Sequence, residues 1–106
     1  MNDLLWSDPD DNICGWRESP RGAGFLFGED MSKEFNHKNN LKMIGRAHQL
    51  FSAGFNKTHD DNVVTVFSCP NYCFRCGNQG AMLDLDENMG QTYIQYDHAA
   101  LSGQKV

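Results

Sequence analysis

The chain of 106 residues has no apolar run that approaches the length of a bilayer span, and no basic segment followed by an apolar core at its start. We therefore expect neither a transmembrane helix nor a secretory signal peptide. Basic residues are scarce, because nine Lys and Arg stand against 14 Asp and Glu, with a net charge of −5. Since phosphate backbones attract basic surfaces, this balance disfavours a nucleic acid as partner.

The sequence also lacks internal repeats and low-complexity segments. Its length allows one domain with a real core, near the lower end of domain sizes. The first half offers few regular patterns: residues 1–28 read as loop, and a short helix follows. Asp30 is the predicted N-cap of that helix, and Met31 and Phe35 share one of its faces at i, i+4.

The strands are predicted to cluster late in the chain. Residues 41–48, "LKMIGRAH", read as a buried strand, and residues 51–62 as a turn-rich connector. Residues 63–68, "VVTVFS", form the clearest strand. Its β-branched run lacks polar alternation, which indicates burial on both faces.

Two further strands, residues 81–87 and 91–97, are predicted on either side of the turn "ENMG". Their alternation places Leu83 and Leu85 inward and the intervening aspartates outward. The tail, residues 98–106, is predicted to be loose. The pattern as a whole predicts mixed α and β structure.

Two residues stand where a ligand could bind. His48 ends the predicted strand, so it is either a metal ligand or a hydrogen-bonded structural histidine. Arg21 lies in "SPRGAG", where glycines let the backbone approach a ligand and a guanidinium can bind phosphate or carboxylate oxygens. The alternative is a surface arginine in a turn. A Walker loop is excluded by the glycine spacing.

Three of the four cysteines, Cys69, Cys73 and Cys76, lie in "SCPNYCFRCGN", and Cys14 is far upstream. A structural zinc site usually needs two C-x-x-C pairs, and only one is present. A thioredoxin-like motif should open a helix, whereas the Gly-Asn that follows favours a turn. Zinc and redox chemistry stay open, but the sequence favours reduced, unpaired loop thiols.

Tyr72 lies in the same loop. It is either a ring packed at the sheet edge or an aromatic side chain whose polar tip meets a ligand. His37, His59 and His98 lie in polar connectors or the tail, and we assign no chemistry to them.

Four motifs in order, "DLLWSDPDD", "SPRGAGFLFG", "RAHQL" and "FSCPNYCFRCGN", resemble the C-terminal part of the PPP-family serine/threonine protein phosphatases. The resemblance runs from about residue 3 to about residue 97, with the family's order and spacing. The stretch "NYCFRCGN" is similar to the 2A-like branch, whose type member is the catalytic subunit of protein phosphatase 2A.

The resemblance implies an α+β fold over residues 1–97, as the C-terminal part of a metallophosphoesterase (calcineurin-like) β-sandwich flanked by helices. It implies hydrolysis of phosphoserine and phosphothreonine in proteins. The implied cofactors are two divalent metal ions, manganese, iron or zinc, which activate a water for attack on phosphorus.

By the same resemblance, His48 is a ligand of one metal, Arg21 binds phosphate near the metals, and Tyr72 lines the catalytic site. The loop around Tyr72 is then the rim that touches substrates and inhibitors, and its C-x-x-C is expected to bind no metal. The rim contributes three further residues: Cys73, Arg75 and Cys76.

The motifs that carry the other metal ligands and the catalytic histidine in this family are absent. We therefore expect a fragment, or the product of a truncated gene, that is inactive alone. The chain ends in "GQKV" where the 2A-like branch has "DYFL". Arg17 and Glu18 replace apolar residues of the family and would alter the charge at the rim.

The expected partners of the parent enzyme are phosphoprotein substrates and scaffold and regulatory subunits, with no nucleic acid and no membrane. The expected location is the cytoplasm, with the nucleus as a second location. Two alternatives remain: a non-catalytic fragment that binds a phosphatase scaffold or inhibitor, and a thiol or zinc module built on the cysteines.

Overall fold

The computed structural model describes residues 1–98, which form two compact units. The first unit comprises Met1–Gln49 and Asn56–Thr65, and the second comprises Leu50–Phe55 and the described chain from Val66 on. The predicted tail, residues 98–106, lies outside the described residues except for its first member.

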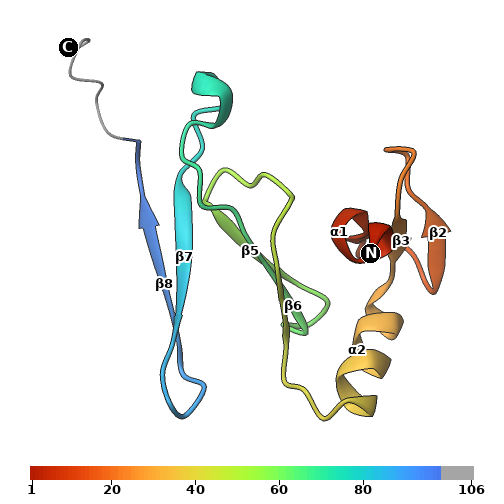
Figure 1. The fold of residues 1–106 in the computed structure, drawn as a ribbon. Coiled ribbons are helices and arrows are strands. Elements are labelled where there is room, and N and C mark those ends of the chain that lie inside the picture. Colours follow the sequence, from red (N-terminus) through yellow and green to blue (C-terminus); the bar gives the residue numbers. More distant parts are fainter. Residues whose placement is uncertain (99–106) are drawn as a thin grey trace. The chain divides into compact units, whose positions relative to one another are not determined.

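The first unit begins with a short helix and three short strands (Figure 1). They are α1 (Asn2–Trp6), β1 (Asp8–Pro9), β2 (Trp16–Glu18) and β3 (Phe25–Phe27). The sheet order is β1-β3-β2, with β1 parallel and β2 antiparallel to β3. The prediction of loop over residues 1–28 is therefore wrong in part. Strands of two or three residues are too short to show a period in the sequence.

Helix α2 (Glu29–Lys38) has Gly28 as its N-cap residue, without a side-chain cap. The prediction of Asp30 as N-cap is wrong, because Asp30 lies inside the first helical turn. Its carboxylate accepts a hydrogen bond from the backbone N–H of Gly15 at 3.0 Å, so it ties the helix to the preceding loop instead.

A second sheet has the order β4-β6-β5, formed by β4 (Ile44–Arg46), β5 (Phe55–Thr58) and β6 (Val63–Val66). The first three residues of β6 are buried, which confirms the predicted strand. Strand β5 lies in the predicted connector and was not foreseen. Its polar residues, "FNKT", resemble those of a loop.

Strand β4 is shorter and more open than predicted for residues 41–48. Ile44 and Arg46 are half-buried and Gly45 is exposed. Two causes account for this. The chain is still in the turn after α2 at Leu41, whose N–H donates to the carbonyl of Asn36 at 2.8 Å. Strand β4 also lies at the edge of its sheet, so that only one neighbour covers it.

The second unit contains the predicted hairpin, β7 (Gly80–Leu85) and β8 (Gln91–Tyr96), paired antiparallel (Figure 1). Leu83 is half-buried as predicted, but Leu85 is 44% exposed, so its inward placement is wrong. Phe55 stacks on Tyr93, the cross-strand partner of Leu83, at 4.4 Å. Leu85 lies at the turn end of the hairpin, two residues further along β7.

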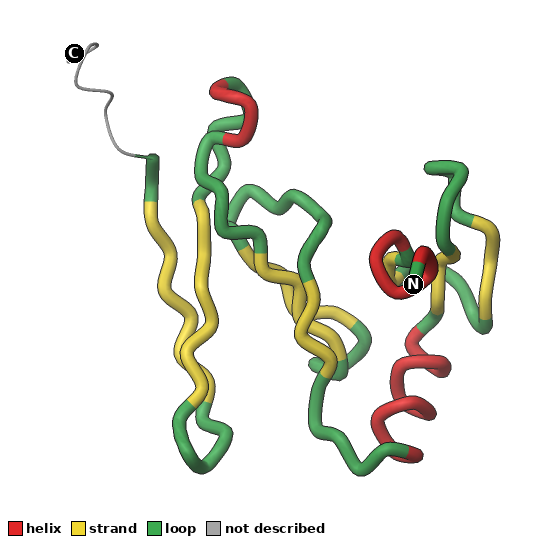
Figure 2. The backbone as a smooth tube through the Cα atoms, in the orientation of Figure 1, coloured by secondary structure: helices red, strands yellow, loops and turns green. Residues whose placement is uncertain are grey.

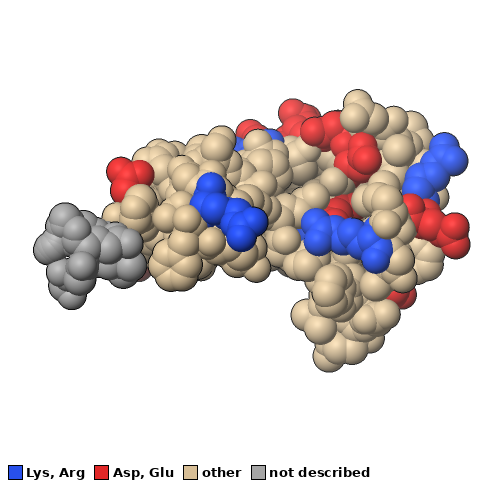
Figure 3. All heavy atoms as spheres, turned by 90° about the horizontal axis from the view of Figure 1, so that it is seen from above, with Lys and Arg blue, Asp and Glu red and all other residues tan. Residues whose placement is uncertain are grey.

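Loops connect nearly all of these elements, and one of them contains the single-turn 3-10 helix η1 (Tyr72–Phe74; Figure 2). None of the helices within residues 1–98 is both long and apolar enough to cross a bilayer. On the face drawn in Figure 3, acidic and basic side chains both occur among uncharged residues, in places side by side.

Candidate functional site

Arg21 lies in the loop between β2 and β3, at the tip of a hydrogen-bonded turn. The hydroxyl of Ser19 accepts the N–H of Arg21 at 3.2 Å, and the Ser19 carbonyl accepts the N–H of Gly22, also at 3.2 Å. Gly24 closes the turn with φ +71°, and a Cβ there would lie 2.7 Å from the Trp6 carbonyl carbon. Only glycine fits this close approach.

A buried carboxylate, Asp8, orients the side chain of Arg21. The Nε of Arg21 lies 3.0 Å from Oδ2 of Asp8, whose side chain is 4% exposed. The second oxygen, Oδ1, accepts from Nη2 of Arg46 at 2.5 Å. Asp8 therefore joins two guanidinium groups. Sequence reasoning missed this role, because "SDPDD" is typical of a turn.

The guanidinium of Arg46 makes several hydrogen bonds. Beyond Asp8, its Nη2 donates to the Ser7 carbonyl at 3.0 Å, and its Nη1 donates to Gln49 Oε1 at 2.7 Å and Thr65 Oγ1 at 3.0 Å. Burial lowers the pKa of the Arg46 guanidinium, while the hydrogen bond and charge of Asp8 oppose that shift. Arginine stays protonated in any case, so Arg46 is a fixed positive charge.

His48 meets the other side of Arg21. Nη1 of Arg21 lies 3.0 Å from Nε2 of His48. Because a guanidinium can only donate, Nε2 is the acceptor in this contact. The edge of the ring packs against Trp6 with the ring centroids 5.0 Å apart. His48 has φ +86°, a left-handed conformation that few residues other than glycine adopt.

The described residues do not form a complete metal site. Within residues 1–98, no three His, Cys, Asp or Glu side chains come together as a group that could hold a metal ion. His48 Nε2 can serve as a single nitrogen ligand once its lone pair no longer accepts from Arg21. Asp8 does not fit, because both of its oxygens already face guanidinium groups.

Tyr72 belongs to the second unit. Its ring is 44% exposed and makes an edge contact with Phe67, with the ring centroids 5.1 Å apart. Part of the side chain is thus packed and part is open, and a contact between its polar tip and a ligand stays a prediction. Arg21 and His48 lie together in the first unit, whereas Tyr72 belongs to the second.

Two asparagines hold the loop around Tyr72, and neither was singled out in the sequence. Asn78 is 3% exposed; its Oδ1 accepts the N–H of Tyr72 at 2.8 Å, and its Nδ2 donates to the Cys69 carbonyl at 2.9 Å. Asn71, with φ 47°, accepts the N–H of Gly77 at 3.0 Å through its Oδ1. These amides close the loop without any ion pair.

The rim residues predicted from the sequence lie on the outside of this loop. Cys73, Arg75 and Cys76 are exposed, and Cys14 and Cys69 are exposed free thiols as well. Cys73 has φ 57° inside the single 3-10 turn. The C-x-x-C therefore lies in a turn, as predicted, and does not open a helix.

No family model matches the chain. Among solved structures, the chain is similar to a protein serine/threonine phosphatase from Saccharomyces cerevisiae with similarity to human phosphatase PP5. The identity is 28% and the TM-score 0.83, over 92% of this chain and 34% of that one. The chain thus spans about one third of the length of that structure.

The fold is therefore mixed α+β and matches part of a PPP phosphatase fold, as predicted. The likeness supports the PPP family of serine/threonine phosphatases. It does not single out the 2A-like branch, because the similar structure is described by its similarity to human phosphatase PP5.

Proposed function

We propose that the chain is the C-terminal part of a protein serine/threonine phosphatase catalytic domain of the 2A-like branch. The reaction of the parent enzyme is metal-dependent hydrolysis of phosphoserine and phosphothreonine in proteins. The contact between Arg21 and His48 is the main support, because it joins residues 27 positions apart beside a buried carboxylate. The branch rests on the loop "NYCFRCGN" alone.

Arg21 is suited to bind a phosphate group. Its side chain is 40% exposed, and Asp8 fixes it through Nε. A guanidinium has five N–H donors, so donors remain for anionic oxygens beside those that face Asp8 and His48. Charge-assisted hydrogen bonds of this kind strengthen as negative charge develops on a transferring phosphoryl group.

His48 is suited to hold one metal through Nε2. That lone pair now accepts from Arg21, and one lone pair cannot serve a donor and a metal together. Metal binding at His48 would therefore release an Arg21 donor for phosphate. The remaining ligands belong to polypeptide outside the described residues. Bound manganese, iron or zinc ions would supply Lewis-acid activation of the attacking water.

The loop that carries Tyr72 is proposed as the rim that contacts phosphoprotein substrates. Its side chains are exposed, and the polar tip of Tyr72 can hydrogen-bond a substrate backbone. Cys73, Arg75 and Cys76 share this rim. Scaffold and regulatory subunits are proposed partners of the parent enzyme.

The test begins with the sequence of the transcript upstream of Met1. The complete product is then assayed with a phosphoserine peptide and manganese. We expect Arg21→Ala to lower the rate by roughly 100-fold, since loss of one transition-state donor commonly costs this much. Lys42→Ala, which removes the same charge from an exposed position after α2, is the matched control.

An Arg21→Ala rate within about two-fold of the Lys42→Ala rate would remove Arg21 from the site. A complete product without phosphatase activity, but with affinity for a phosphatase scaffold, would favour the non-catalytic alternative. Zinc that copurifies with the chain and is lost in Cys73→Ser would favour the thiol or zinc module.

A further inference from the structure

Few apolar side chains of the described residues are buried. The buried hydrophobic residues in residues 1–98 are Val63, Val64 and Ala81. Eight large apolar side chains of the first unit are exposed: Met1, Leu4, Leu5, Trp6, Trp16, Phe25, Phe35 and Leu41. Monomeric proteins rarely leave large contiguous patches of apolar surface exposed to water. We therefore expect other polypeptide to cover the apolar surface of this unit.

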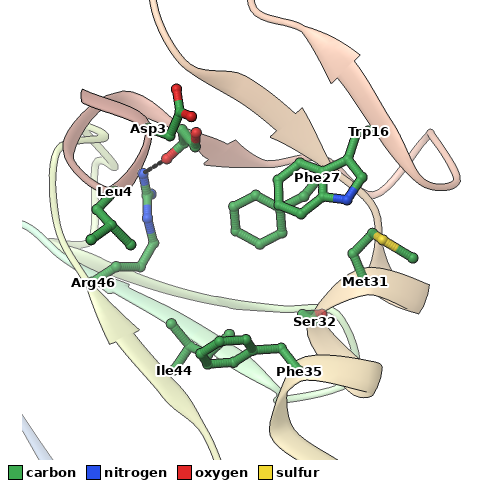
Figure 4. A pocket seen from close by; sticks show the side chains of 10 residues that line it. Asp3, Leu4, Trp16, Phe27, Met31, Ser32, Phe35, Ile44 and Arg46 are labelled. Atoms are coloured by element: carbon green, nitrogen blue, oxygen red, sulfur yellow. Dashed lines mark hydrogen bonds between the residues drawn. The ribbon is translucent and has the colours of Figure 1, made fainter. Parts of the chain in front are cut away.

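Part of this exposed surface converges on one pocket of about 250 Å³ in the first unit (Figure 4). Its apolar members are Leu4, Trp16, Phe27, Met31, Phe35 and Ile44. Met31 and Phe35 come from one face of α2, as the sequence predicted. Trp16 and Phe35 are still 59% and 52% exposed. We call these six side chains the apolar pocket.

Two polar side chains at the pocket, Ser32 and Arg46, are already engaged. Ser32 Oγ lies 2.8 Å from His59 Nδ1 and 3.0 Å from the Glu29 carbonyl oxygen. Arg46 is neutralised by Asp8, and its Nη2 also donates to the Ser7 carbonyl at 3.0 Å. The pocket therefore offers an anion little, and it suits apolar side chains, whose burial is favourable in proportion to the area removed from water.

The size of the similar phosphatase indicates where such side chains come from. The chain reproduces one third of that fold with a TM-score of 0.83, and two thirds of that polypeptide have no counterpart here. A second copy of this chain is a weaker candidate, because two molecules with a net charge of −5 repel each other.

Resting on the proposed function, we propose that the apolar pocket is the surface on which the rest of a phosphatase catalytic domain docks, through an apolar segment that fills it. Docking covers Trp16 and Phe35. Because α2 follows the Arg21 loop after the short strand β3, the same contact would link completion of the fold to the arginine loop.

The test mixes the chain with the separately expressed part of the yeast phosphatase that lies outside the match. Hydroxyl-radical footprinting then reports the oxidation rates of individual side chains. We expect the rates of Met31, Trp16 and Phe35 to fall several-fold. Met89, an exposed methionine in the turn of the hairpin, is the internal control and should keep its rate.

A pair of variants tests the binding itself. Phe35→Glu places a charge in the pocket and should weaken binding by roughly tenfold or more. His37→Glu adds the same charge to an exposed position of α2 that does not line the pocket, and should stay within about two-fold. Phe35 is exposed, so the first variant does not disturb a packed core.

Two outcomes would overturn the proposal. One is unchanged oxidation of Met31 and Trp16 in the presence of the yeast polypeptide. The other is protection that appears in the chain alone and grows with its own concentration, because the occupant would then be a second copy. The phosphatase assay of the complete product is independent of both, so the proposed function can hold while the docking surface fails.

Discussion

The two units hold their candidate functional side chains by different physical means. In the first unit, Asp8 binds Arg21 and Arg46 at once, and its side chain is 4% exposed. In the second unit, the amides of Asn71 and Asn78 close the loop around Tyr72 through neutral hydrogen bonds. A buried carboxylate organises the first unit, whereas neutral hydrogen bonds between asparagine amides and the backbone organise the loop of the second.

This difference has consequences for rigidity. Removal of one partner of a buried ion pair leaves an uncompensated charge and costs about 3–5 kcal/mol. A neutral hydrogen bond contributes about 1 kcal/mol net. The loop also holds Asn71, Cys73 and Phe74 at positive φ, where each residue other than glycine costs roughly 1–2 kcal/mol. The comparison therefore predicts a fixed arginine site and an adaptable rim.

The comparison is tested most severely by the activity of the isolated chain. We expect the 106-residue chain to hydrolyse no phosphoserine peptide with manganese present. Neither unit has a group of three potential metal ligands among its described residues, and His48 alone cannot hold two metals. Turnover by the chain that disappears in His48→Ala would show that one unit suffices for the chemistry.

The second largest effect is expected at the buried charge. Asp8→Asn keeps the shape of the side chain and removes its charge, which leaves Arg46 buried without a counter-ion. We expect the free energy of unfolding to fall by about 3–5 kcal/mol. Urea unfolding of the complete product, followed by tryptophan fluorescence, measures it, since Trp6 and Trp16 both report on the first unit.

Asp10→Asn is the matched control for this prediction. The carboxylate of Asp10 accepts one hydrogen bond, from the N–H of Asn12 at 2.8 Å, and an amide oxygen can accept the same bond. The control should therefore cost less than about 1 kcal/mol. An Asp8→Asn cost as small as this would mean that charge does not organise the first unit.

Prediction from sequence succeeded where a pattern is local and repeated. The β-branched run of β6 and the alternation in β7 and β8 each specify a strand without reference to the rest of the chain. The motif resemblance also named Arg21 and His48. In the fold, Nη1 of Arg21 lies 3.0 Å from Nε2 of His48. Neither residue alone indicated the other.

The failures arose where a residue's role depends on distant partners. Asp8 looks like part of a polar turn, and only the approach of Arg21 and Arg46 buries it. Asp30 has the sequence pattern of a helix N-cap, but its carboxylate accepts a hydrogen bond from the backbone N–H of Gly15. Leu85 follows the alternation of its strand, but it lies at the turn end of the hairpin, where it is exposed. Short polar segments carry no period that could have shown these contacts.

In the second unit, Asn78→Ala sharpens the comparison by removing the neutral network. The variant leaves the N–H of Tyr72 and the carbonyl of Cys69 without their partner. We expect a loss of about 1–3 kcal/mol that is confined to the loop. Hydrogen exchange of the Tyr72 amide measures it directly.

Asn88→Ala is the control for the loop variant. Asn88 is exposed in the hairpin turn, and its hydrogen bond to Asp86 uses the backbone N–H, which alanine keeps. It should leave the exchange of Tyr72 unchanged. Global unfolding in Asn78→Ala, with faster exchange in the first unit as well, would contradict the view that the amide network acts only on the rim.

The smallest effect is expected at Asp11, an exposed carboxylate of the first unit that binds a neutral donor. The hydroxyl of Thr58 donates to Asp11 and lowers the pKa of that carboxyl below its ordinary value of 3.8, with the N–H and charge of His59 acting in the same direction against slight desolvation. A carboxyl with a lowered pKa in the folded state favours folding when ionised. That contribution is present above about pH 4 and is lost as the pH falls through the folded pKa.

Thr58→Val removes the donor while the shape of the side chain is nearly kept, and Asp11→Asn removes the titration. Both variants should melt slightly below the wild type at pH 6, because Asp11 is 63% exposed and its interactions are screened by water. The difference between Asp11→Asn and wild type should shrink as the pH falls from about 4 toward 2. Melting temperatures of the complete product across this range measure it. A difference that grows on acidification would mean that the carboxylate opposes folding, and that charge acts in the first unit only where it is buried.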